Sequence, residues 1–511
     1  MPCDPCQPRP AARTGPDVSR RSVLRGIGAG SAGLALGAAA PLLTTGCTER
    51  ADRYTPDGRL ILSYWEKWTG SEGDAAQALV DAYNASQDEV FVQRTTISDM
   101  QNKLMLATAG GNPPDIAGTW SWVVIPYAEK NALTPLDGYM RDLGVERDDF
   151  IPVYWDMCTH RDFLWAMPST PASLALHYNR DLIAAAHAHA PDYFDRHNLS
   201  AHAPPPDIAR FEKLNEALTI VEIKRDGKAQ QVRYTDLTDA EKAKPDDSFS
   251  IVALGHSPYE PDWYIPMYWL FFGGDVWDGE SKVTPDDPGL IAWLRWIESY
   301  PKRFGPNNLQ RFSSGLGQFG TAQNPFMTQL VAMQLQGPWN YTFINTYAPH
   351  LRWDVQAFPA LDPVALPNPT LTECDVLVIP NGAKHPREAA RFIAFASSQQ
   401  GQETLNLGQR KFSTRLETSD AFFRDHPNPH IETFVELSRS ESAATTPAMG
   451  IWKQYDEELR QACSSVFKLT KTPEDALAEA CARAQWKLDR ERKRWDRVGE
   501  ARLEEWERAV R

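Results

Sequence analysis

The order of apolar and polar residues between positions 60 and 119 restricts the fold more than any other feature of the chain. Short apolar runs typical of buried strands alternate there with segments that have the spacing of amphipathic helices. The pattern predicts strands at Leu60–Trp65, Val90–Thr95 and Asp115–Thr119, and helices at Asp74–Ala85 and Met100–Ala109. Strands separated by helices favour an α/β fold with a mostly parallel sheet. In such sheets, ligands bind at the carboxyl ends of the strands.

The length and charge of the chain further restrict the possible architecture and partners. A chain of 511 residues is too long for one ordinary hydrophobic core and favours two lobes. The net charge of −14 argues against nucleic acid or an anionic membrane surface as the main partner. Residues 184–247, rich in Ala, His, Pro and charge, are predicted to be an insertion that elaborates the second lobe.

The first 46 residues have the features of an export signal. Arg20 and Arg21 lie in Ser19–Arg25, which is a close match to a bacterial twin-arginine motif. The apolar run Gly26–Leu43 has about the length of the hydrophobic region of a signal peptide. Export across a membrane is therefore predicted, and residues 1–46 are assigned to the signal.

Cys47 follows a segment, Leu42–Gly46, that resembles a bacterial lipobox. Cleavage after Ala38–Ala40 is the alternative, but it would place Pro41 next to the cut. We therefore expect lipidation at Cys47, which would anchor the mature protein to a membrane surface.

The other cysteines indicate neither a metal site nor a disulfide framework. Cys3 and Cys6 have no second ligand pair, so no metal and no cofactor are expected. Cys463 and Cys481 either pair in an oxidising compartment or stay buried and free. Residues 490–511 are dense in both signs of charge, which predicts a solvated C-terminal helix.

Five segments, in order, resemble the motifs of family 1 extracellular solute-binding proteins, the maltose-binding-protein-like group. The segments are Pro114–Asp137, Leu164–Leu182, Phe272–Thr284, Val331–Trp339 and Val378–Ile393. The inserted region departs most from the family pattern, at Pro206–Arg210.

The resemblance implies a two-lobed periplasmic-binding-protein fold of type II-like organisation, in which two α/β lobes close on a ligand about a hinge. Each lobe is expected to be discontinuous and to contain a mostly parallel sheet. We expect residues 57–170 and 331–371 to form the N-terminal lobe. Residues 171–330 and 372–489 are expected to form the C-terminal lobe.

The resemblance also implies a function and partners. The protein is expected to be a periplasmic or extracytoplasmic substrate-binding component of an ABC importer. It is expected to capture a carbohydrate (a mono- or oligosaccharide, or a polyol) between its two lobes and to deliver it to the membrane permease subunits. It is expected to be a monomer, and not an enzyme.

Sugars present flat C–H faces and hydroxyl edges, so their sites combine aromatic platforms with planar hydrogen-bonding groups. Trp339 ends a Gly-Pro-Trp segment that in the family lies near ligand. The other candidate ligand-binding residues follow predicted strands, belong to an aromatic cluster, lie near an expected crossing segment or match a family motif: Trp65, Trp68, Glu66, Trp120, Trp263, Asp375 and Arg415. Core packing is the alternative for each tryptophan, an inter-strand contact for Asp375, and a surface ion pair for Arg415.

Two other functions stay open on sequence alone. An exported enzyme acting on polysaccharide would need two paired carboxylates, and no motif in the chain pairs them. A surface lipoprotein that binds glycans without an importer would share every sequence feature above.

Overall fold

The alternating segment folds as predicted. The computed structural model describes residues 52–510, and the export signal, including Arg20, Arg21 and Cys47, lies outside them. The segment contains β1 (Leu60–Glu66), α1 (Gly70–Ser86), β2 (Val90–Thr96), α2 (Met100–Ala109) and β3 (Ile116–Trp120). Strand β1 pairs in parallel with both β2 and β3, so the carboxyl ends of all three strands meet at one edge.

The first sheet is completed by strands from much later in the chain. Its order is β14-β13-β3-β1-β2, with β6 (Met167–Ser173) also paired with β13 (Thr370–Val378). Strand β13 runs antiparallel to β3 and β6 and parallel to the two-residue strand β14 (Ala443–Ala444). A buried apolar core surrounds this sheet, and we call this part the first lobe.

The second sheet has the order β12-β7-β11-β10-β8-β9. Its strands are β7 (Ala175–Asn179), β8 (Ile220–Arg225), β9 (Lys228–Arg233), β10 (Phe249–His256), β11 (Val331–Gln336) and β12 (Trp353–Gln356). Only β10 and β11 pair in parallel within it. The sheet is therefore mostly antiparallel, unlike the expectation, because the inserted region contributes the β8–β9 hairpin and β7 runs against both of its neighbours. A second buried core surrounds this sheet, and we call this part the second lobe.

The strands divide between the two sheets differently from the expected boundaries. Residues 331–371 were expected in the N-terminal lobe, yet β11 pairs with β7 and β10 of the second sheet. Residues 372–489 were expected in the C-terminal lobe, yet β13 pairs with β3 and β6 of the first. A single residue, Leu174, separates β6 from β7, so the chain passes directly from the first sheet to the second there.

Helices cover both sheets. Around the first sheet lie α3 (Val124–Glu129), α4 (Asp137–Asp142), α5 (Pro152–Asp156), α14 (Pro386–Ser397), α15 (Gln399–Gln409), α16 (Asp420–Asp425) and α17 (Ile431–Ser438). The helices that follow the second-sheet strands in sequence are α6 (Arg180–His189), α7 (Pro191–Arg196), α8 (Ile208–Leu218), α9 (Asp239–Lys242), α10 (Pro245–Ser248), α11 (Pro288–Phe304), α12 (Pro306–Ser314) and α13 (Asn340–Tyr347). Later in the chain, α18 (Trp452–Phe467) packs on α11 and on the 3-10 helix Asp262–Phe272.

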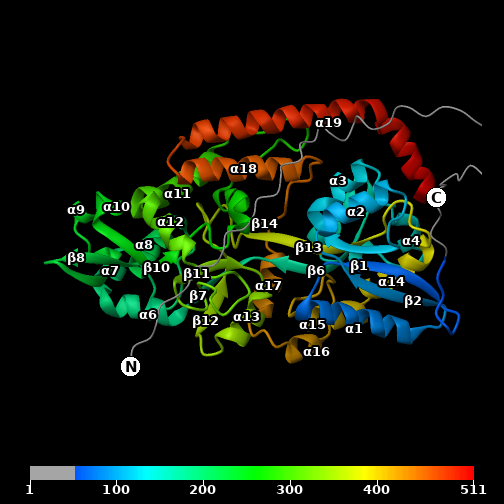
Figure 1. The fold of residues 1–511 in the computed structure, drawn as a ribbon, viewed down its shortest axis with the longest axis horizontal. Coiled ribbons are helices and arrows are strands. Elements are labelled where there is room, and N and C mark those ends of the chain that lie inside the picture. Colours follow the sequence, from blue (N-terminus) through cyan, green and yellow to red (C-terminus); the bar gives the residue numbers. More distant parts are fainter. Residues whose placement is uncertain (1–51, 511) are drawn as a thin grey trace, which may run out of the picture. The chain divides into compact units, whose positions relative to one another are not determined.

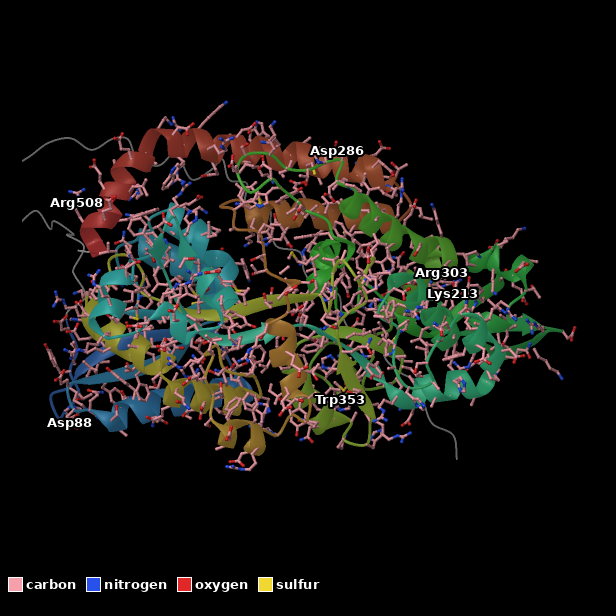
Figure 2. All side chains as sticks on the ribbon, turned by 180° about the vertical axis from the view of Figure 1, so that it is seen from behind. Asp88, Lys213, Asp286, Arg303, Trp353 and Arg508 are labelled. Carbon is pink, nitrogen blue, oxygen red and sulfur yellow. The ribbon has the colours of Figure 1, made fainter. Side chains whose placement is uncertain are left out.

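A buried ion pair ties two helices of the second lobe together. Glu212 of α8 pairs with Arg303 of α11 and also accepts a hydrogen bond of 2.7 Å from the indole nitrogen of Trp296. Arg303 also pairs with Glu216, which pairs in turn with Lys213; Arg303 and Lys213 are labelled in Figure 2. Burial alone would raise the pKa of Glu212, but Arg303 and the Trp296 hydrogen bond lower it below its usual value. The carboxylate therefore stays ionised inside the core.

The long helix α19 (Pro473–Val510) belongs to both cores. Its first half buries Leu477, Cys481 and Leu488 against the second lobe, beside α18 and α11. Its last turns reach α4 (Figure 1). Trp506, which lies in these turns, is buried in the first core. The prediction of a simply solvated helix at residues 490–511 is thus wrong at Trp506, because one face of the charged segment packs on the first lobe.

The described cysteines are all free. Cys463 and Cys481, whose pairing was left open, are separate buried thiols, and the Tyr455 hydroxyl lies 3.2 Å from the Cys481 sulfur. Among residues 52–510, none of the helices has the length and apolar character needed to cross a membrane.

Candidate ligand-binding site

A cavity of about 240 Å³ lies where the carboxyl ends of β1 and β3 meet residues of the second lobe. Its wall is mainly aromatic, with rings from Trp68, Trp120, Trp122, Trp263, Tyr264, Phe319, Trp339 and Phe343. The remaining lining residues are Glu72, Thr170, Ala172, Glu373, Cys374, Asp375 and Lys411. The cavity is therefore a ring-lined space with a small number of charged groups, which is the usual composition of a small-molecule site.

The structure brings five of the eight sequence-predicted ligand-binding residues together in this cavity. Trp68 follows β1, and Trp120 is the last residue of β3. Asp375 of β13 is paired in register with Trp120 across the sheet. Trp263 and Trp339 reach the same space from the second lobe.

The other three predicted residues do not line the cavity. Trp65 packs against the first core, because alternate residues of a strand point to opposite faces. Glu66 is buried behind the wall, where it accepts hydrogen bonds from the Tyr64 hydroxyl and from the Lys67 backbone N–H at 2.7 Å. A side chain on Gly118 would overlap this carboxylate, so Gly118 gives it room.

Arg415 is also away from the cavity lining. Its guanidinium pairs with Asp149 at 3.3 Å, donates to the Ser397 carbonyl at 3.2 Å and lies over the Phe150 ring. Arg415 therefore forms an ion pair, which was the alternative to ligand binding, and it connects segments of the first lobe.

Trp339 is held by its own strand end. Its indole nitrogen donates a hydrogen bond of 3.0 Å to the side-chain oxygen of Gln336, the last residue of β11. The ring lies so close to the backbone of Gly337 that a Cβ there would overlap ring carbons. Glycine at residue 337 thus leaves room for the Trp339 ring, which lines the cavity.

We expect Gly337→Ala to lower the free energy of unfolding by about 1–3 kcal/mol, the usual cost of forcing atoms into a packed site. Guanidinium denaturation followed by circular dichroism measures the change. Gly315→Ala is the matched control, because the nearest atom to its added Cβ would be 3.5 Å away and its φ of −91° suits alanine. Equal stability of the two variants would contradict the assigned role of Gly337.

Two buried lysines and three carboxylates form a charged cluster at the cavity wall and behind it, and Lys411, Asp375 and Glu72 of this cluster line the cavity. Lys67 lies 3.2 Å from one oxygen of Asp375 and 3.5 Å from Glu66. Lys411 lies 3.5 Å from the other Asp375 oxygen and 3.2 Å from Glu72. Asp375 also accepts a hydrogen bond of 2.6 Å from the Thr170 hydroxyl. Burial alone would lower the pKa of Lys411, but Glu72 and Asp375 raise it above its usual value, so the lysine stays charged.

The ammonium groups of Lys67 and Lys411 also form cation–π contacts with tryptophan rings of the wall. The Lys67 ammonium lies 4.4 Å from the ring centre of Trp68 and 4.9 Å from that of Trp120. The Lys411 ammonium lies 4.5 Å from the ring centre of Trp68 and 5.7 Å from that of Trp339. Trp120 also stacks on Trp122, with ring centres 5.8 Å apart and an angle of 22° between the planes. Cation–π contacts and stacking therefore fix the orientation of the cavity wall.

Sequence reasoning missed several lining residues. Lys411, Thr170 and Glu373 are brought in by the pairing of β13 with β6 and by the segment after α15, for which no local pattern exists. Phe319 and Phe343 come from a loop and a short helix, where aromatic residues are usually core. Within residues 52–510, no group of three His, Cys, Asp or Glu side chains is placed to hold a metal ion.

The chain is similar in sequence to the maltotriose-binding protein of Pyrococcus abyssi (strain GE5 / Orsay). The two are 24% identical over 287 residues, which is 55% of this chain and 50% of that protein. The match thus spans about half the length of this relative.

Solved structures share the fold over most of their length. A mannotriose-bound structure of CpMnBP1 superposes with a TM-score of 0.67 at 24% identity, covering 83% of this chain and 99% of that one. The cyclic alpha-maltosyl-1,6-maltose binding protein of Arthrobacter globiformis superposes with a TM-score of 0.62 at 18% identity, covering 84% and 99%. The likeness shows the two-lobed α/β fold that the sequence predicted.

One family model covers most of the chain. Residues 67–403 match the model of the bacterial extracellular solute-binding proteins. This range includes both sheets except β1 and the short strand β14, together with most of the cavity wall. The chain therefore belongs to the family of bacterial extracellular solute-binding proteins.

Proposed function

We propose that this protein captures a small carbohydrate in the aromatic cavity and delivers it to the permease of an ABC importer. One observation carries the proposal: five tryptophans, Trp68, Trp120, Trp122, Trp263 and Trp339, line one cavity together with charged hydrogen-bonding groups. Flat rings suit the C–H faces of a sugar, and carboxylate and ammonium groups suit its hydroxyl edges.

The cavity volume favours a short ligand. Ligand pockets usually enclose about 300–1,000 Å³, and this cavity encloses about 240 Å³. A monosaccharide or disaccharide therefore suits this arrangement of the lobes better than a long oligosaccharide. The related proteins named above bind maltotriose and mannotriose, which supports carbohydrate as the ligand class.

We propose that binding closes the two lobes about the extended segments that join them. Trp68, Trp120 and Asp375 belong to the first lobe, whereas Trp263 and Trp339 belong to the second. On this proposal the first lobe contains residues 52–173 and 370–447, and the second contains 174–369 and 448–489. A ligand held between rings of both lobes would favour the closed arrangement by its contacts to both.

We propose that the protein is not an enzyme, although three cavity carboxyls, Glu72, Glu373 and Asp375, raise the question of hydrolysis. Glu72 is paired with Lys411. Glu373 and Asp375 extend from the same strand and reach the cavity from one side. Glycosidases need their two carboxyl groups on opposite sides of the scissile bond. This arrangement suits recognition better than bond cleavage.

The site of action follows from the signal features. We propose export through the twin-arginine signal that contains Arg20 and Arg21, with attachment to the membrane through lipid on Cys47. We further propose that the protein acts as a monomer outside the cytoplasm.

A thermal-shift and tryptophan-fluorescence screen over sugars and polyols tests the carbohydrate proposal. We expect at least one sugar to raise the melting temperature, because a ligand that binds only the folded state stabilises it. Trp339→Ala is expected to weaken the binding of that sugar by about 2 kcal/mol, or about 30-fold, which is the effect typical of a central aromatic contact.

Trp486→Ala provides the control, because Trp486 is 58% exposed on α19 and lies outside the cavity lining. Sugar affinity should be unchanged in this variant. A panel without any shift, or cleavage of a glycan by the wild-type protein, would overturn the proposal.

A further inference from the structure

Glu373 is a carboxyl in the cavity wall to which the described part of the chain offers no hydrogen-bond or ion-pair partner. It lies two residues before Asp375 on β13, and both side chains line the cavity, as alternate residues of a strand do. Asp375 has Lys67, Lys411 and Thr170 as partners. Among residues 52–510, none forms a hydrogen bond or an ion pair with the Glu373 side chain.

The cations near the cavity are already committed. Lys67 is shared by Glu66 and Asp375, and Lys411 is shared by Glu72 and Asp375. Two ammonium groups therefore face three carboxylates before Glu373 is counted. Glu373 is a fourth carboxyl, and among residues 52–510 no cation forms an ion pair with it.

The other charged groups around Glu373 are mostly acidic. Burial raises its pKa to about 7, and Asp375 on its own strand and Asp456 on α18 contribute to the rise. Lys411 opposes this rise, while Asp456 itself pairs with Arg460 at 2.9 Å. The ring of Tyr264 is the neighbouring uncharged group, and its own pKa is raised by burial and then by Glu373. Without a ligand, Glu373 is thus partly protonated at neutral pH.

Two aromatic rings of the cavity wall, those of Trp263 and Tyr264, differ from three of the tryptophan rings in their relation to the lysines. Lys67 and Lys411 lie over Trp68, Trp120 and Trp339. No lysine or arginine of the described chain lies over the rings of Trp263 or Tyr264, which line the same cavity. A ring face next to an uncompensated carboxylate is a favourable place for an ammonium group.

We propose that the solute is a carbohydrate bearing a basic amine, and that Glu373 binds this amine. The inference rests on the proposed carbohydrate function and names the class of sugar. A ligand ammonium group would supply a positive charge beside Glu373, while the hydroxyl groups of the sugar would contact the Asp375–Lys411 side.

Isothermal titration calorimetry with three matched sugar pairs tests this assignment. The pairs are glucosamine and glucose, galactosamine and galactose, and mannosamine and mannose. We expect at least one amino member to bind the wild-type protein about tenfold or more tighter than its neutral partner at pH 7. Glu373→Gln keeps the size of the side chain and removes its charge, so it should abolish the preference and leave the neutral member within about threefold.

The pH profile of the wild-type protein gives a second readout that needs no variant. Below pH 7 the amine must displace a proton from Glu373, so its affinity should rise by about tenfold between pH 5.5 and 7.5. In Glu373→Gln the rise should be absent. Asp88→Asn, which removes one exposed charge from the β2 side of the first lobe (Figure 2), should behave as wild type.

Three results would overturn the inference. Equal affinity for neutral and amino members, or an amine preference that survives Glu373→Gln, would remove Glu373 from recognition and leave the proposed function intact. If every amino member failed to bind while neutral sugars bound, Glu373 would again have no role in recognising an amine, and the proposed function would stay intact. Failure of the wider sugar panel as well would overturn the proposed function itself.

Discussion

Replacing Trp506 by alanine is expected to lower the free energy of unfolding by about 3–5 kcal/mol, the cost typical of truncating a buried tryptophan. The side chain is 1% exposed, and its ring centre lies 4.5 Å from that of Trp165 and 5.5 Å from that of Phe163. Its indole nitrogen also donates to the side-chain oxygen of Asn131 at 3.3 Å. Denaturation by guanidinium, followed by circular dichroism, measures the loss.

The same helix offers a matched control. Trp486 is 58% exposed and touches solvent and Arg490, whose guanidinium lies 4.7 Å from its ring centre. Trp486→Ala should therefore cost less than about 1 kcal/mol. If the two variants lost equal stability, Trp506 would not be the residue that fixes α19 to the first lobe.

Asp375→Asn is expected to lower the free energy of unfolding by about 3–5 kcal/mol, because it removes one member of a buried ion cluster and leaves charged partners behind. Asp375 is 7% exposed and lies between Lys67 and Lys411. Asparagine has nearly the same shape, so the loss would report the charge and not the packing.

The loss should also change the response to alkaline pH. Burial lowers the pKa of Lys411, but Glu72 and Asp375 raise it above the usual value overall. A raised pKa in the folded state gives stability that is complete below the unfolded pKa of about 10.4 and is lost as pH rises through the folded value. Asp375→Asn removes one cause of the rise, so the variant should lose stability at a lower alkaline pH than wild type.

Asp181→Asn is the matched control, because it removes the same charge from an ion pair at the surface. Asp181 pairs there with Arg352, and the two side chains are 47% and 71% exposed. Exposed pairs of this kind contribute about 0–1 kcal/mol. If Asp375→Asn also lowered the free energy of unfolding by only about 0–1 kcal/mol, Lys67 and Lys411 would have to find other partners once the aspartate charge is gone.

Local patterns in the sequence were enough to predict the first sheet and part of the cavity. Trp68 and Trp120 could be predicted because each follows a strand whose apolar run is plain in the sequence. Trp65, predicted by the same rule, does not line the cavity, since the rule about strand ends gives the edge of a sheet but not which of two neighbouring tryptophans faces the cavity.

Long-range pairing limits what the sequence alone can give. Lys411 and Glu373 reach the cavity because β13 crosses back to β3, more than 250 residues away in the chain. The expected lobe boundaries also depended on where β11 and β13 pair, and each strand is apolar enough to suit either sheet. Trp506 lies in a segment whose charge pattern resembles a solvated helix, and a single apolar anchor there leaves the pattern almost unchanged.

The position of α19 has a consequence for how the protein is made. Because this helix follows every other described element and contributes to both hydrophobic cores, a chain still emerging from the ribosome lacks part of each core. Contacts such as Phe163 with Trp506 join residues 343 positions apart, and closing so long a loop slows folding. Both lobes should therefore mature after synthesis, with their apolar faces shielded by a chaperone until α19 is released.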